Sequence, residues 1–405
     1  MSNSETSPDE GFEREAGQIE TGRFAPGWAT MWLLAKLLRR LVQNGRLTIC
    51  DPFGETWHFG PGGYMDGTLR IEAGSLRDLL SVCTSDMDAI DASPGVRLVR
   101  WLDAFMARKL HHNPISRSHA NVAHHYDIST ELYDLFLDAN RQYSCAYFPT
   151  GNETLDEAQA LKKKHIAAKL LLRPGMEVLD IGSGWGGLAM EFAQQHGARV
   201  TGLSLSTEQI AAARDSAAQS GLSGQVAFEK RDYREELGQY DRVVSVGMFE
   251  HVGRSGFDAF FTTLQRVLKP DGVALVHAIG TMAPKGGSDP WIRKYIFPGG
   301  YLPTLSETIA AAERSGMWVT DVEVLRLHYA ETLRQWSERF AAERETARML
   351  YDERFCRMWE FYLTVCEMAF RNGRLMVFQI QLAKRRDAVP LTRDYIAKVE
   401  AGESA

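Results

Sequence analysis

The glycine-rich segment 178–187, VLDIGSGWGG, contains the residues best suited to hold a ligand. Apolar residues precede the glycines and WGGLAMEFAQQHG follows, which predicts a strand, a tight turn and a helix. Glycine is needed where the backbone turns sharply and a ligand presses against it. In open α/β sheets that ligand lies beyond the carboxyl ends of the strands. The residues expected to contact it are Asp180, Gly182, Gly184, Trp185 and Gly186.

The order of these residues, DxGxGxG, resembles the signature of methyltransferases that use S-adenosylmethionine (SAM), whereas a dinucleotide site would show GxGxxG. The next expected strand does not end in the acidic residue that many such enzymes use to bind the ribose, and we expect Ser204 and Gln209 to replace it. The adenine normally lies after the third strand. The candidate contacts in this region are Ser204, Leu205, Ser206, Gln209, Asp232 and Tyr233. The alternative interpretation is a turn that binds no cofactor.

The elements that must position these residues alternate from about residue 175 onward. Apolar strands such as RVTGLSLS, VAFEKRD, DRVVSVG and GVALVHAIG are separated by helical segments, and WVTDVEVLRL and MVFQIQLAKR predict two last strands. This alternation predicts an α/β fold, a doubly wound and mostly parallel sheet.

The N-terminal part of the chain has a different pattern. Residues 1–28 are polar and predict a disordered tail, and 31–42 predict an amphipathic helix with Lys36, Arg39 and Arg40 on its polar face. Residues 47–60 predict a β-hairpin, and 75–110 predict helices. We therefore expect a small α+β accessory, lipid-binding domain over 29–110, a catalytic domain over 111–390 that opens with a linker, and a tail over 391–405.

Composition excludes some function classes. The net charge of −6 argues against a nucleic-acid partner, although a local basic patch is enough for a membrane surface. The five cysteines form no close metal-type pair, and no metal site is expected. No apolar run approaches the roughly 20 residues that span a bilayer, and no secretory signal is visible. The expected location is the cytoplasm, at the inner face of the membrane.

Six ordered blocks resemble the family of cyclopropane fatty acid synthases and mycolic acid cyclopropane synthases. They are HHYDIS (124–129), QYSCAYF (142–148), LDIGSGWGG (179–187), VGMFEHVG (246–253), HAIG (277–280) and DPWIRKYIFPGGYLP (289–303). The resemblance covers about 111–385 and implies a Rossmann-like class I SAM-methyltransferase fold. Two departures are Ser183, where the family usually has Cys, and Ser204, where it usually has Thr.

The resemblance also implies a mechanism. An alkene attacks the sulfonium methyl group of SAM, and a bound bicarbonate then removes a proton so that a cyclopropane ring closes. The residues that match the bicarbonate pocket are Cys145, Glu250, His277, Ile279 (through its N–H) and Tyr329. Beside this anion we expect like-charge repulsion to raise the pKa of Glu250. Tyr143, Phe148 and Trp185 are expected near the sulfonium, and Ser144 near the cofactor.

Three further features of the sequence each allow a structural and a functional interpretation. Cys366 matches a family cysteine that has been regarded as an active-site residue, but its apolar helix favours a buried structural thiol. The run Lys162-Lys163-Lys164 predicts a solvated helix face. The long segment 281–303 is rich in glycine and aromatic residues, which favours a lid or a wall for an acyl chain.

The resemblance implies an enzyme that transfers a methylene group from SAM to the cis double bond of a phospholipid acyl chain. One alternative stops after methyl transfer and gives a methyl-branched or hydroxylated chain. Others are a methyltransferase for a soluble small molecule and a lipid-binding protein with a vestigial SAM fold. A homodimer is kept as a candidate assembly, because the sequence does not determine the oligomeric state.

Overall fold

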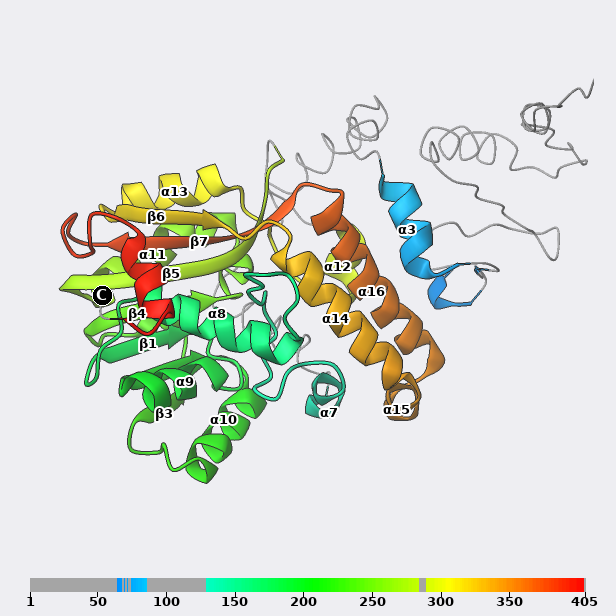
Figure 1. The fold of residues 1–405 in the computed structure, drawn as a ribbon, viewed down its shortest axis with the longest axis horizontal. Coiled ribbons are helices and arrows are strands. Elements are labelled where there is room, and N and C mark those ends of the chain that lie inside the picture. Colours follow the sequence, from blue (N-terminus) through cyan, green and yellow to red (C-terminus); the bar gives the residue numbers. More distant parts are fainter. Residues whose placement is uncertain are drawn as a thin grey trace, which may run out of the picture.

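The computed structural model describes residues 64–67, 69, 71, 74–85, 129–283 and 289–403. The expected tail 1–28, the basic helix 31–42, the hairpin 47–60, the linker and most of the helices predicted over 75–110 lie outside the described residues, so these expectations stay predictions. Within the described part, a mixed sheet with helices on both faces lies beside a layer of helices (Figure 1).

The sheet has seven strands in the order β3-β2-β1-β4-β5-β7-β6. Their bounds are β1 Glu177–Ile181, β2 Arg199–Ser204, β3 Val226–Lys230, β4 Tyr240–Val246, β5 Leu268–Thr281, β6 Trp318–Val324 and β7 Leu375–Ala383. The first five are parallel, and β7 runs antiparallel to both β5 and β6. The predicted, mostly parallel sheet is confirmed. The chain reverses its winding direction between β1 and β4, which is where ligands bind in such sheets.

Each face of the sheet buries its own apolar core. On one face, α8 (Leu155–Lys169), α9 (Gly187–His196) and α10 (Thr207–Gln219) cover side chains such as Val178 and Val244. On the other face, α11 (Phe257–Val267) and α13 (Leu305–Arg314) cover Leu179 and Val243. Successive residues of one strand point to opposite faces, so apolar runs in β1 and β4 supply both cores.

A third core holds the helical layer together. Its helices are α7 (Thr130–Asp134), α12 (Pro290–Tyr295), α14 (His328–Ala342), α15 (Arg344–Leu350) and α16 (Glu353–Arg371). The long helices α14 and α16 lie side by side, and α3 (Leu76–Thr84) packs on the outside of α16 (Figure 1). Arg77 of α3 forms an ion pair with the buried Glu367 of α16 at 2.9 Å.

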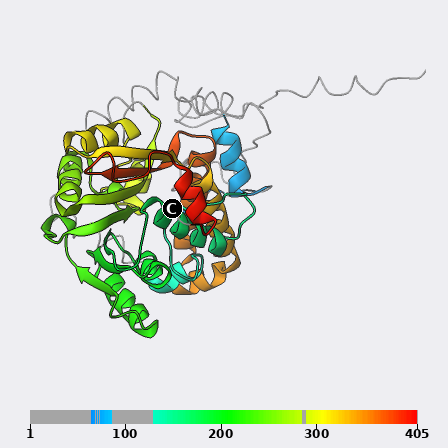
Figure 2. The ribbon, with the colours of Figure 1, turned by 60° about the vertical axis from the view of Figure 1, so that its left-hand side comes forward.

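The end of the chain differs from the tail that was expected over 391–405. Residues 394–400 form the helix α17 (Asp394–Glu400), which packs on α8 through buried Tyr395 and Ile396. Glu400 also contacts His165 of α8 at 2.6 Å. Figure 2 brings this side forward, with α17 in red. The segment is short, and two apolar residues, Tyr395 and Ile396, are too few to show the helical periodicity from which a helix is predicted.

Candidate active site

The glycine turn after β1 has the geometry that its sequence predicts. Gly182, Gly184 and Gly186 all have positive φ, at 86°, 56° and 82°. A Cβ atom would lie 2.8 Å from Met248 at Gly182 and 2.5 Å from Phe228 at Gly186, so these two glycines are required by close packing. At Gly184 no heavy atom of the described residues lies within 4 Å. Gly184 is therefore the position of the turn at which a ligand can approach the backbone.

The strand ends beside this turn carry buried polar groups. Asp180 at the end of β1 is buried, its Oδ2 has no hydrogen-bond partner among the described residues, and burial raises its pKa to about 7. Ser204 donates to Gln209 Oε1 at 2.9 Å, and Ser206 caps α10. Asp232 after β3 caps a short 3-10 helix (Tyr233–Glu235) and pairs with Arg234. The candidate ribose and adenine residues are thus held by local hydrogen bonds at one edge of the sheet.

Segment 142–148 is fixed beside the glycine turn by α8. Gln159 donates to the backbone oxygens of Gln142 and Ser144, and Lys162 donates to their side-chain oxygens at 2.8 Å each. Lys162 and Lys163 are buried. The expectation of a solvated lysine face is therefore wrong for these two residues, whereas Lys164 is exposed. Gln159 and Lys162 are three residues apart and so lie on the same face of the helix. This spacing was the signal in the sequence that both side chains could bond to the same segment.

Glu250 lies directly after β4, in a 3-10 turn (Phe249–His251), and it is 6% exposed. Its Oε1 accepts a hydrogen bond from the N–H of Ile279 at 2.5 Å, whereas its Oε2 has no partner among the described residues. Burial raises the pKa of Glu250 to about 7. Desolvation alone raises this pKa within the described residues, and the expected contribution of a bound anion stays a prediction.

His277 and Ile279 are two residues apart on β5, and their side chains therefore point to the same face. His277 is buried, and its Nδ1 lies 3.1 Å from Gln379 Nε2. Because the amide nitrogen donates, Nδ1 accepts and the ring hydrogen lies on Nε2. Burial holds the pKa of His277 well below its ordinary value, so the ring is neutral.

Tyr329 lies near three groups from other elements, Cys145, Cys366 and Glu250. Tyr329 of α14 is buried, and its pKa is raised well above the ordinary value by burial and by Cys145, Cys366 and Glu250. Burial raises the pKa of the Cys145 thiol, and it raises that of Cys366 to about 12. The structure therefore brings Cys145, Glu250, Ile279, Tyr329 and Cys366 together. Both cysteines are free thiols, Cys145 buried and Cys366 partly buried, and the structural interpretation of Cys366 stays a prediction.

Aromatic rings form a wall over this group. Tyr143 stacks on Trp336 at 5.2 Å between ring centroids and shares a hydrogen bond with Tyr362 at 2.8 Å. Trp185 packs against Tyr133 at 4.9 Å. Phe148 lies in the same apolar core as Trp185, and its ring contact is with His328, so its expected position near the sulfonium stays a prediction. The motifs did not reveal Trp336 and Tyr362, because both lie on helices whose pattern indicates only an apolar face.

The described part of segment 281–303 closes over the wall. Phe297 contacts Tyr362 at 5.8 Å and Tyr143 at 6.5 Å, and Trp291 of α12 contacts Phe361 at 4.9 Å. The N–H of Tyr301 donates to the backbone oxygen of Glu250 at 2.9 Å. The described part of this segment thus packs against the aromatic wall, and its expected role as a lid or as a wall for an acyl chain stays a prediction.

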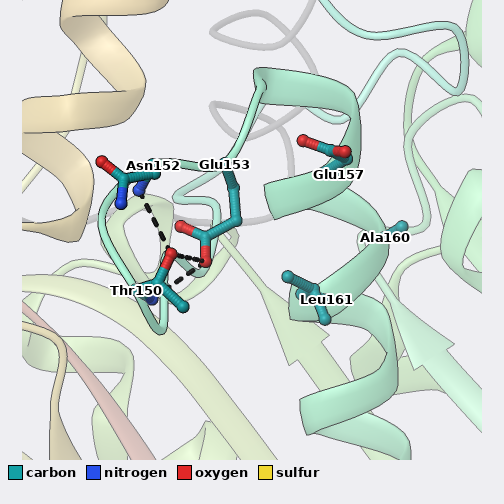
Figure 3. A pocket seen from close by; sticks show the side chains of 6 residues that line it. All are labelled: Thr150, Asn152, Glu153, Glu157, Ala160 and Leu161. Carbon is teal, nitrogen blue, oxygen red and sulfur yellow. Dashed lines mark hydrogen bonds between the residues drawn. The ribbon is translucent and has the colours of Figure 1, made fainter.

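A hollow of about 500 Å³ lies elsewhere, at the start of α8 (Figure 3). The loop residues Thr150, Asn152 and Glu153 face Glu157, Ala160 and Leu161 across it. Glu153 accepts hydrogen bonds from Thr150, and most of the lining is exposed. None of the candidate residues lines this hollow, so it is a surface feature and not the active site.

The fold and the glycine turn define a class I SAM-dependent methyltransferase. The family model described as mycolic acid cyclopropane synthetase matches residues 114–380, and the chain belongs to this family. The chain is an enzyme that uses SAM, and the predictions of fold, family and enzyme class are confirmed.

Within the described residues there is no helix long and apolar enough to cross a membrane, and no group of metal-ligating side chains.

Individual relatives are similar over different lengths. A probable fatty acid methyltransferase of Pseudomonas putida is 36% identical over 328 residues, which cover 79% of this chain and 81% of the relative. The cyclopropane-fatty-acyl-phospholipid synthase of Escherichia coli is 42% identical over 260 residues, which cover 64% of this chain and 66% of the relative. The crystal structure of mycolic acid cyclopropane synthase CmaA1 complexed with SAH and CTAB matches with a TM-score of 0.63 and 36% identity, over 67% of this chain and 99% of that chain.

Proposed function

We propose that this enzyme transfers a methylene group from SAM to the cis double bond of an unsaturated phospholipid acyl chain and forms a cyclopropane ring. The alkene attacks the methyl carbon, the carbon–sulfur bond breaks, and S-adenosylhomocysteine (SAH) leaves. The resulting cation loses one proton from the new methyl group, and the ring closes. The observation that carries this proposal is Glu250, a buried carboxylate with one oxygen that has no partner among the described residues. It interacts with Tyr329 of the aromatic core and comes two residues after Met248, which lies against Gly182 of the glycine turn.

The residues around Glu250 suit a cationic reaction. An alkene is a weak nucleophile, so water and stronger nucleophiles must be excluded from the site. The rings of Tyr143, Trp336 and Phe297 exclude water, and their faces stabilise positive charge. The raised pKa values keep Cys145 and Cys366 protonated, so neither thiol traps the cation as a thiolate would.

We further propose bicarbonate as the base that takes the final proton. Glu250 Oε2, which has no partner among the described residues, would accept its O–H group, while the Nε2–H of His277 and the hydroxyl of Tyr329 are candidate donors to its other oxygens. The N–H of Ile279, which was expected to bind the ion, instead donates to Glu250 in this structure and so orients that carboxylate. Turnover should fall in bicarbonate-depleted buffer and recover when bicarbonate is restored; an unchanged rate would assign the proton to another base.

The second candidate function is methyl transfer without ring closure, which the similarity to a probable fatty acid methyltransferase favours. SAM with a trideuterated methyl group separates the two outcomes. Purified enzyme is incubated with vesicles of an unsaturated phospholipid, and the acyl chains are analysed by mass spectrometry. A cyclopropane retains two deuterium atoms, because one is lost as the departing deuteron. A methyl branch keeps all three when the cation is quenched by water or loses a proton from a neighbouring chain carbon, and no label in the lipid would contradict both functions.

We also propose that the accessory part docks on anionic membranes at their cytoplasmic face. The basis is the sequence of the expected helix 31–42, with Lys36, Arg39 and Arg40 on one side. Each basic residue near an anionic surface contributes about 1 kcal/mol. Replacing all three by Glu should weaken sedimentation with anionic vesicles and leave SAH binding intact. Equal sedimentation of this variant and the wild type would contradict the proposal.

A further inference from the structure

Lys162 is a buried cation that the reaction described above does not use. It lies on α8 and is fully buried, and its Nζ donates to Gln142 Oε1 and Ser144 Oγ at 2.8 Å each. Gln159, three residues earlier on the same helix face, donates to the backbone oxygens of the same two residues. A buried ammonium is costly unless its charge is paired. A lysine at this position therefore indicates a task that an apolar residue could not perform.

The charged surroundings of Lys162 point toward the glycine turn. Its nearest acidic groups are Asp138 and Asp180. Asp138 already accepts hydrogen bonds from the N–H groups of Asn140 and Gln142. Asp180 lies at the end of β1, and its Oδ2 has no partner among the described residues. The ammonium thus lies between segment 138–144 and the strand end at which the cofactor is expected.

The hydrogen bond from Lys162 determines what the Ser144 hydroxyl can do. An ammonium has no acceptor, so Ser144 Oγ must accept from Lys162 and direct its own hydrogen elsewhere. The structure shows no bond from this hydroxyl to another described residue. The segment also touches the start of α9, since a Cβ atom at Gly187 would lie 2.6 Å from Asn140 O and Gln142 Nε2. Ser144 is therefore a free donor, backed by a positive charge, beside the cofactor turn.

We propose that Lys162 is a positioning residue that orients the Ser144 hydroxyl to donate its hydrogen to the carboxylate of the cofactor's amino-acid end. This inference rests on the proposed placement of SAM at the glycine turn. A hydroxyl donor with a cation behind it stabilises an anion, and the carboxylate is the anionic group of SAM. Gln159 and Lys162 together hold the segment, and Lys162 alone supplies the charge.

Calorimetry with two ligands tests the proposal. SAH carries the carboxylate, whereas decarboxylated SAH keeps the amine, the sulfur and the adenosine. Lys162→Met and Ser144→Ala should each weaken SAH binding by about 10- to 100-fold, the usual cost of a hydrogen bond to a charged group, and should change binding of the decarboxylated ligand far less. The double variant should bind SAH about as weakly as whichever single variant has the lower affinity for SAH, because Lys162 acts through Ser144.

Two neighbouring lysines serve as matched controls. Lys164→Met changes an exposed lysine, and Lys163→Met changes a buried lysine that bonds to Glu191 and not to segment 142–144. Neither should discriminate between the two ligands. If Ser144→Ala and Lys162→Met weaken the binding of both ligands equally, the proposal is overturned, and Lys162 has only a structural role. If the Lys162→Met protein does not fold, the same comparison of the two ligands is made with Ser144→Ala and with Lys162→Gln, which keeps a hydrogen-bond donor. Wild-type enzyme that binds neither ligand would instead overturn the cofactor placement.

Discussion

The carboxyl edge of the sheet and the helical layer that faces it present different kinds of side chain to the same site. The sheet edge presents backbone at Gly184 and buried polar groups such as Asp180 and Glu250. The helical layer presents rings, among them Trp336 and Tyr362. The two regions meet where Trp185 from the glycine turn and Ile279 from β5 pack into the core of the helical layer.

This difference separates the tasks of the enzyme by location. Polar groups with an unpaired oxygen occur on the sheet side, at Asp180 and Glu250, where a small polar ligand can satisfy them. The hydroxyls of Tyr143 and Tyr362 on the helical side satisfy each other, and the groups without a partner among the described residues there include indole N–H donors such as that of Trp336, not carboxylate oxygens. We infer that the sheet edge binds the cofactor and handles the proton, and that the helical layer receives the acyl chain.

The largest effect is expected from Glu250→Ala. This change removes the carboxylate that is proposed to hold the base, and turnover should fall by about 10²- to 10⁴-fold, the usual contribution of general-base catalysis. SAH affinity should change little, because Glu250 follows β4 and not the glycine turn. The variant should also respond less to bicarbonate than the wild type. A large loss of SAH affinity with normal turnover at saturation would place Glu250 in the cofactor site instead.

Glu250→Gln should change how stability depends on pH. The ordinary carboxyl pKa of 4.5 is raised to about 7 in the folded protein, so the folded state binds this proton more tightly. The wild type therefore loses stability as pH rises from 4.5 to 7, by up to about 3 kcal/mol. The glutamine variant lacks this loss, and its free energy of unfolding relative to the wild type should rise over that interval. Urea unfolding at several pH values measures it, and a difference independent of pH would show that Glu250 is not desolvated.

Gly184→Val should separate the cofactor from the lipid. The side chain would extend into the open space before Gly184, and SAH affinity should fall about a hundredfold or more. Gly221→Val is the matched control, because Gly221 also has a positive φ, 69°, and no neighbour within 4 Å among the described residues. Both variants carry the same kind of backbone strain, so only a specific loss of SAH binding in Gly184→Val supports the placement. An equal effect of both would assign the loss to strain.

The sheet side was predictable from sequence and the helical side was much less so. The order strand, glycine turn, helix is a local pattern, and the structure places all seven predicted strands as strands. Buried parallel strands are apolar on both faces, which makes them visible in a single sequence. The antiparallel direction of β7 depends on a chain reversal that leaves no local signal.

The partners of buried polar residues could not be predicted, because they come from distant segments. Lys162 meets Ser144, 18 residues away, and Tyr143 meets Tyr362, 219 residues away. A lysine run with no such context indicates a solvated face, since lysine is seldom fully buried. Glu250 was predicted as a site residue from its motif. The cause of its raised pKa, burial, required the packing around β4 and α14.

The smallest effect is expected from Phe297→Ala, which tests the helical side. Phe297 comes from the lid segment, and its ring contacts Tyr143 and Tyr362. An aromatic pair contributes about 0.5–1.5 kcal/mol beyond its buried area, so KM for phospholipid vesicles should rise by up to about tenfold. SAH affinity should stay within experimental error, because the ring faces the wall and not the glycine turn. The conservative change Phe297→Leu should restore part of the loss, since it refills apolar volume without the ring. If Phe297→Ala weakened SAH and lipid equally, the lid would serve both ligands, and the division between sheet edge and helical layer would not hold.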